Sequence, residues 1–125
     1  MTEDRRPAGE PAIRTVAMPA DTNPNGDIFG GWLMAQMDTA GAVAAVRRSK
    51  GRVATVAVAG MNFHKPVLVG DIVSCYAEIV KVGRTSMTVT VETWIDRRSG
   101  ESYEVTEGTF VYVALDDQGR PRAVE

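Results

Sequence analysis

One apolar segment of helical length, followed only by strand-like segments, most constrains the fold of this chain. From about Gly30 to Arg47 the residues are mostly apolar or small. Asp27 precedes this segment as a plausible N-cap, the cationic residues up to Lys50 suit the negative end of a helix dipole, and Gly51 is expected to end the helix. We therefore expect one long helix between residues 30 and 47.

The remaining segments have the patterns of strands. Residues 12–18 form a short candidate strand that stops at Pro19. Residues 52–63 are apolar or small on both faces, which predicts a central strand covered on both sides. Residues 71–82 and 85–95 flank a turn at 82–84, and a last strand ends at "DDQGR". The order of strand, helix and four strands predicts an α+β fold, with the helix laid on one face of a curved antiparallel sheet.

Composition narrows the class of protein. A chain of 125 residues suits one domain, which we place at residues 12–125 after a flexible N-terminal tail of residues 1–11. A net charge of −2 without a basic stripe argues against nucleic acid as a partner. The apolar run contains Gln36 and Asp38 and little bulk, so we expect no membrane span. The lone cysteine and the charged first residues predict a cytoplasmic protein.

Asp38 is the unusual residue of the predicted helix. Its neighbours one turn away are Met34, Ala35, Gly41 and Ala42, so the helix offers no cation to pair with it. Burying an unpaired charge costs several kcal/mol, which indicates a residue kept for chemistry. The alternative is a carboxylate that is satisfied by a backbone group or reaches solvent at the helix edge.

Two further features lie near the start of the helix. Gly30 and Gly31 leave backbone N–H groups open to a developing oxyanion, although a tight turn with close packing is an equal alternative. Asp38 lies about two turns further on, roughly 10 Å along the helix axis. This spacing leaves room for a bound carbonyl group near the glycines and an attacking water molecule nearer the acid. Asn23 precedes the helix in "DTNPNG" and, judged on the residues alone, reads as a turn asparagine.

The other polar candidates lie among the strands. Gly83, Arg84, Thr85 and Ser86 place one cation and two hydroxyls at a hairpin tip, as a phosphate grip or as an ordinary polar turn. His64 follows a strand and is interpreted as structural or exposed, and Cys75 as a packing residue. The chain has no zinc-ligand spacing, phosphate-loop glycine pattern or nucleophile elbow, so we predict no metal site.

Four stretches carry a resemblance to a known family: "MPADTNPNGDIFGGWLMAQMD", "RVATVAVAGMNFHKPVLVGDIVSCY", "KVGRTSMTVTVETW" and "VTEGTFVYVALDDQGR". From about Ile13 to Arg122 the chain resembles the hotdog-fold acyl-coenzyme A (acyl-CoA) thioesterases, in particular their bacterial YciA-like branch. The resemblance implies a single hotdog domain with a five-stranded antiparallel sheet wrapped around one long helix. It also implies homodimers, often assembled as trimers of dimers, with active sites at the dimer interface.

The resemblance assigns roles to the candidate residues. Asp38 falls on the family's helix carboxylate, a base or nucleophile, and Asn23 on a loop asparagine that assists it from the facing subunit. Gly31, with Gly30, is expected to polarise the thioester carbonyl, and residues 83–86 to lie near the phosphates of CoA. The strand residues expected beside the pantetheine arm are Ala57, Val58, Ala59, Gly60 and Met61.

The implied activity is hydrolysis of short- to medium-chain acyl-CoA to free CoA and a carboxylic acid, with no cofactor beyond the CoA of the substrate. Two alternatives keep the fold. One is a hotdog dehydratase or hydratase, but those enzymes place a histidine at the catalytic loop or helix, whereas His64 lies at a strand end. The other is a protein that binds acyl-CoA without catalysis.

Overall fold

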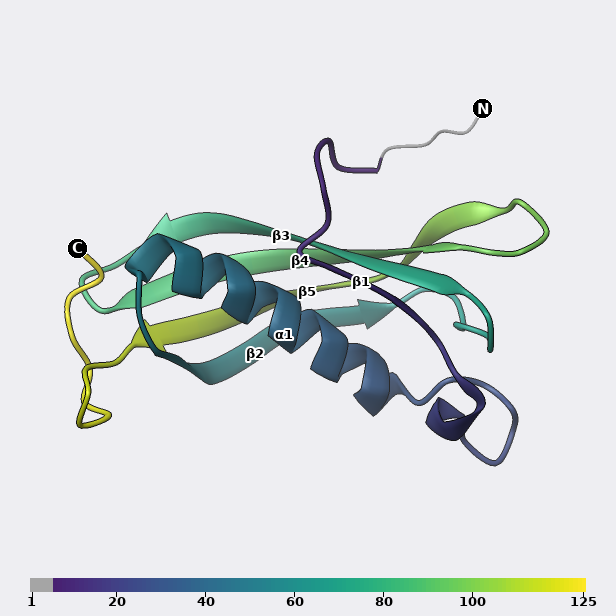
Figure 1. Ribbon diagram of the computed structural model, residues 1–125, viewed down its shortest axis with the longest axis horizontal. Coiled ribbons are helices and arrows are strands. Elements are labelled where there is room, and N and C mark those ends of the chain that lie inside the picture. Colours follow the sequence, from purple (N-terminus) through teal and green to yellow (C-terminus); the bar gives the residue numbers. More distant parts are fainter. Residues whose placement is uncertain (1–5) are drawn as a thin grey trace.

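The computed structural model describes residues 6–125 and confirms the predicted order of elements (Figure 1). All strand pairs are antiparallel, in the order β1-β3-β4-β5-β2. The elements are β1 (Ile13–Val16), a 3-10 helix (Pro19–Asp21), α1 (Gly30–Ser49), β2 (Val53–Phe63), β3 (Ile72–Val82), β4 (Ser86–Asp96) and β5 (Ser102–Ala114).

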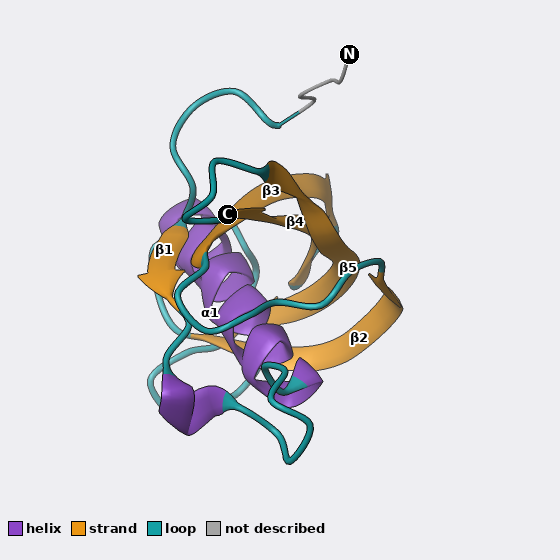
Figure 2. Cartoon of the chain, turned by 90° about the vertical axis from the view of Figure 1, so that its right-hand side faces the viewer, coloured by secondary structure: helices purple, strands orange, loops and turns teal. Residues whose placement is uncertain are grey.

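Helix α1 packs on the concave face of a strongly curved sheet (Figure 2). Helix α1 buries Leu33, Met37, Ala40, Gly41 and Ala45. The strands supply the other half of this core, with fully buried side chains that include Met87, Val89, Val91 and Ile95 of β4, Phe110 and Tyr112. The apolar residues of the alternating pattern at 85–95 therefore lie on the inner face of the sheet, because successive side chains of a strand point to opposite sides.

Strand β2 corrects one prediction. It lies at the edge of the sheet rather than in its centre, and it pairs with β5 alone. Its side chains are largely exposed, Val56 to 56% and Val58 to 43%. A residue pattern reports that both faces of a strand are suited to burial, but it does not tell whether the same chain covers them. The exposed edge of β2 is thus an unpaired row of backbone groups beside apolar side chains.

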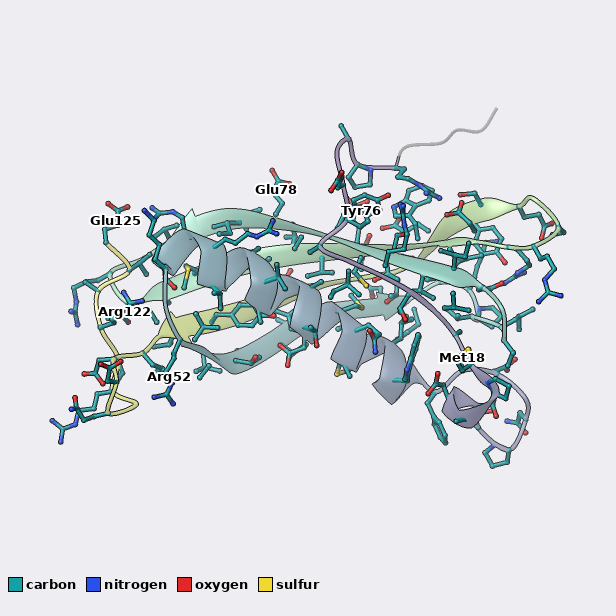
Figure 3. The ribbon with its side chains drawn as sticks, in the orientation of Figure 1. Met18, Arg52, Tyr76, Glu78, Arg122 and Glu125 are labelled. Atoms are coloured by element: carbon teal, nitrogen blue, oxygen red, sulfur yellow. The ribbon has the colours of Figure 1, made fainter. Side chains whose placement is uncertain are left out.

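The ends of α1 also differ from the prediction. Phe29, not Asp27, is the N-cap, because the chain stays extended through Ile28, whose N–H donates to the Val67 carbonyl at 3.0 Å. At the other end the helix continues to Ser49, and Lys50 takes the left-handed conformation with φ 61°. Arg122 binds the Ser49 carbonyl at 2.8 Å, and this contact from the C-terminal segment holds the last turn (Figure 3).

The N-terminal segment crosses the convex face of the sheet. The Arg6 guanidinium binds the Asp96 carboxylate at 2.9 Å and lies 5.4 Å from the centre of the Trp94 ring. The Ala12 N–H donates to the Cys75 carbonyl at 2.9 Å. Of the tail predicted at residues 1–11, residues 1–5 lie outside the described part. Within residues 6–125, no helix has the length and apolar character needed to span a membrane.

Candidate active site

Asp38 lies in the middle of α1 and faces two strands. The Thr55 hydroxyl of β2 donates to its Oδ1 at 2.7 Å. The Tyr112 hydroxyl of β5 lies 3.0 Å from the same Oδ1 and 2.8 Å from the Asp38 carbonyl oxygen. As the sequence predicts, no charged side chain among residues 6–125 pairs with the carboxylate, but it is half-buried and contacts two hydroxyl groups, so the expectation of a dry environment is wrong. Helical spacing misses both partners, because they come from strands 17 and 74 residues further along the chain.

Tyr112 reaches Asp38 because a glycine makes room for it. Its side chain is fully buried and stacks on Phe110, with the ring centres 6.4 Å apart. A Cβ at Gly41, one turn after Asp38, would clash with the Tyr112 hydroxyl and lie 2.9 Å from two ring atoms. Burial, and secondly the hydrogen bond to Asp38, raise the pKa of Tyr112 far above its usual value, so its hydroxyl stays protonated as a donor.

A second group of candidate residues gathers at the start of α1. Asn23, Gly30, Phe63 and His64 line a cavity of about 390 Å³. The Asn23 Oδ1 accepts the backbone N–H groups of residues 25 and 27 at 2.9 and 3.1 Å, which is the turn geometry that the residues alone suggest. Gly31 is exposed, and a Cβ there would meet no atom within 4 Å. The N–H groups of the first helical turn have no acceptor within the helix, so this end is open to an anion.

The predicted phosphate grip lies at the opposite end of the molecule. Arg84 is exposed and lines, with Glu125, a hollow of about 360 Å³, while its carbonyl accepts the Val124 N–H at 2.9 Å. Gly83 N–H donates to the Ser86 carbonyl at 2.8 Å, which closes the tight turn. Thr85 and Ser86 are half-buried. The turn therefore presents the Arg84 guanidinium to solvent beside one carboxylate.

The candidate residues are spread along β2 rather than joined in one pocket. Asp38 binds Thr55 near the start of β2, whereas Asn23 shares its cavity with Phe63, the last residue of β2. Eight residues of strand, roughly 26 Å, separate Thr55 from Phe63. The proposed pantetheine residues, from Ala57 to Met61, occupy the stretch between them (Figure 1). Within residues 6–125, no hydrogen bond joins Asn23 to Asp38.

His64, Glu104 and Glu107 form a polar group outside these sites. One nitrogen or oxygen atom of each lies within 4.8 Å of the others, which is a spacing that could admit a metal ion, and two of the three side chains are exposed. Burial, and secondly the charges of Glu92 and Glu107, raise the pKa of Glu104 to about 7. Sequence spacing misses this group because His64 and Glu104 lie 40 residues apart and meet only through the pairing of β2 with β5.

Cys75 lies in the core. It is fully buried, and burial raises the pKa of its thiol to about 11. A thiol that is neutral and inaccessible is a poor nucleophile, which agrees with the packing role predicted from the sequence.

Solved structures share this arrangement of one helix on five antiparallel strands. The hexameric hotdog fold thioesterase Cj0915 of Campylobacter jejuni matches with a TM-score of 0.92 at 43% identity, over 96% of this chain and 93% of that chain. The hexameric thioesterase y2039 from Yersinia pestis also matches with a TM-score of 0.92, at 56% identity, over 96% and 98% of the two chains. The protein therefore has the hotdog fold.

The sequence comparisons specify the family. Residues 25–100 match the model of the thioesterase superfamily. The acyl-CoA thioester hydrolase YciA of Salmonella typhimurium is 54% identical over 125 residues, which cover 97% of this chain and 94% of the relative. The chain belongs to the thioesterase superfamily, as its resemblance to that family predicts.

Proposed function

We propose that this protein hydrolyses short- to medium-chain acyl-CoA thioesters to free CoA and a carboxylic acid. The observation that carries the proposal is Asp38, a carboxylate held by two hydroxyls in the middle of α1 and directly beside the exposed edge strand β2. The identity of the chain with acyl-CoA thioester hydrolase YciA over nearly its whole length supports the choice of substrate.

Asp38 acts in this proposal as a base or as a nucleophile. As a base, it takes a proton from a water molecule whose oxygen adds to the thioester carbonyl, after which the C–S bond breaks and the CoA sulfur takes a proton. As a nucleophile, a carboxylate oxygen displaces CoA to form an anhydride, which water then cleaves. The N–H groups at Gly30 and Gly31 would stabilise the oxyanion of either route. Both routes need only water and the thioester, so we propose no cofactor.

The site is proposed to be complete only in a dimer. Pairing two β2 edges antiparallel about a two-fold axis would bring the Phe63 end of one strand beside the Thr55 end of the other. Asn23 of the partner subunit would then approach Asp38, and exposed apolar side chains such as Val56 and Val58 would become buried. Both solved relatives are hexameric, which agrees with a trimer of such dimers.

The CoA portion of the substrate is proposed to follow β2. Its pantetheine arm would run beside residues 57–61, and its phosphates would meet Gly83, Arg84, Thr85 and Ser86. The side chains bulky enough to limit the acyl pocket are Trp32, Met34, Met61 and Phe63. Location in the cytoplasm stays a prediction from the sequence.

Thiol release from acetyl-CoA and butyryl-CoA tests this function. The wild-type protein should release CoA, and Asp38→Asn should keep its fold but lose at least about 10²-fold in turnover. A wild-type protein that binds acyl-CoA without releasing thiol would instead be a binding protein. Addition of water to an enoyl-CoA by the same preparation would favour the hydratase alternative. Near-wild-type hydrolysis by folded Asp38→Asn would remove Asp38 from the mechanism.

A further inference from the structure

The two hydroxyl groups that hold Asp38 both contact one oxygen of its carboxylate. Thr55 donates to Oδ1 at 2.7 Å, and the Tyr112 hydroxyl lies 3.0 Å from Oδ1. Within residues 6–125 no hydrogen bond reaches Oδ2, and no charged side chain pairs with the carboxylate. The two oxygens of Asp38 therefore differ in their surroundings.

We propose that Tyr112 is a positioning residue which, with Thr55, fixes Oδ1 of Asp38 and leaves Oδ2 as the oxygen that reacts. The reactive role of Oδ2 rests on the proposed function. The positioning of Oδ1 by Tyr112 and Thr55 does not depend on it. In either proposed route one carboxylate oxygen forms the new bond, to a proton of water or to the acyl carbon. An oxygen that already accepts two hydrogen bonds is the poorer base and nucleophile, so Oδ2 is the reactive one.

The position of Tyr112 makes it suited to orientation rather than to proton transfer. Its ring is fully buried between β5 and α1, and its raised pKa keeps the hydroxyl protonated at any working pH. Among residues 6–125, both acceptors within its reach belong to Asp38, the carbonyl at 2.8 Å and Oδ1 at 3.0 Å. The single proton of this hydroxyl is shared between the two in a three-centre hydrogen bond, which ties the side chain of Asp38 to its own helix backbone and restricts rotation of the carboxylate.

Tyr112→Phe tests the proposal because it removes only the hydroxyl and keeps the ring. We expect kcat to fall about 10-fold or more, the scale of a lost hydrogen bond to a charged group, while KM stays within about twofold. A merely structural role would lower the melting temperature and change kcat and KM together. Tyr103→Phe, a half-buried tyrosine of the same strand, is the matched control and should leave kcat and KM unchanged.

A second measurement keeps the inference testable without turnover. In protein labelled with ¹³C at the aspartate carboxyl carbons, the Asp38 signal is the one missing from Asp38→Asn. The chemical shift of this signal should change in Tyr112→Phe, because the carboxylate loses a hydrogen-bond donor, and should equal the wild-type value in Tyr103→Phe. An unchanged chemical shift together with an unchanged kcat would overturn the role of Tyr112. An absence of thiol release with a changed chemical shift would refute the proposed function and leave the positioning intact.

Discussion

Gly41 of α1 and Tyr112 of β5 are in direct contact, and the absence of a side chain at residue 41 is what permits it. A Cβ at this position would stand 2.9 Å from the Tyr112 Cε1 and Cζ atoms and still nearer to its hydroxyl. The contact places the Tyr112 hydroxyl over the carbonyl of Asp38, three residues earlier in the helix. A glycine in the interior of a helix normally costs stability, so this one is explained by the neighbouring strand.

Gly41→Ala should therefore lower both stability and activity. Overpacking of a core costs about 1–3 kcal/mol, part of which is offset by the better helix propensity of alanine. We expect a melting temperature lower by about 3–6 °C for each kcal/mol of net destabilisation in a domain of this size, measured by calorimetry, together with slower thiol release. Gly31→Ala is the control for stability, because its Cβ would meet no atom within 4 Å and its melting temperature should not fall. A fully stable and active Gly41→Ala would show that Tyr112 can move aside without consequence.

Arg84→Ala should weaken the use of CoA substrates without affecting the chemistry. We expect KM for acetyl-CoA to rise about 10-fold, while KM for an acetyl-pantetheine substrate hardly changes, because the latter lacks the nucleotide phosphates. The measurement is steady-state kinetics with the two thioesters. Arg120→Ala, another exposed arginine, should leave both values unchanged. Equal losses on both substrates would indicate that Arg84 has a structural role in the hairpin.

Asn23→Ala and Asp38→Ala should complement each other if the site is shared between subunits. Each variant alone is expected to be inactive, but a mixed dimer would have one site with both intact residues. Half of randomly formed dimers are mixed and one site of two is intact in each, so activity should reach roughly a quarter of wild type per site. Co-expression with two affinity tags isolates the mixed dimer. Purified variants that do not exchange subunits should stay inactive, and an inactive mixed dimer would refute the shared site.

Glu104 should make the protein less stable as the pH rises. Its pKa is raised from 4.5 to about 7 in the folded state, so the folded state binds a proton more tightly than the unfolded state. Stability is therefore expected to decline between about pH 4.5 and 7, where the unfolded chain has already released this proton. Denaturant unfolding at pH 4.5 and 7.5 should show a smaller decline for Glu104→Gln than for wild type. Glu78→Gln, an exposed residue of β3 that points away from α1, serves as control (Figure 3), and equal declines in all three proteins would contradict this prediction.

The sequence alone determines much of this fold. The change from helical to strand patterns after Gly51, the turn at residues 82–84 and the alternation from Met87 to Ile95 are local signals, and the structure confirms the elements that they predict. The unusual place of Asp38 is also visible locally, because a carboxylate on an apolar helix stands out against its neighbours. These signals can be recognised in a single sequence because periodicity and turn chemistry depend on residues close together in the chain.

Only the tertiary structure decides what surrounds those residues. Thr55 and Tyr112 meet Asp38 because the curved sheet brings the start of β2 and the end of β5 against the middle of α1. The same sheet order leaves β2 at an edge, although its residues suit a covered strand. Neither result can be obtained from local patterns, since a residue's apolar character is the same whether its partner is a distant strand or another subunit. Contacts between residues far apart in the chain depend on strand order and register, which the complete packed chain determines.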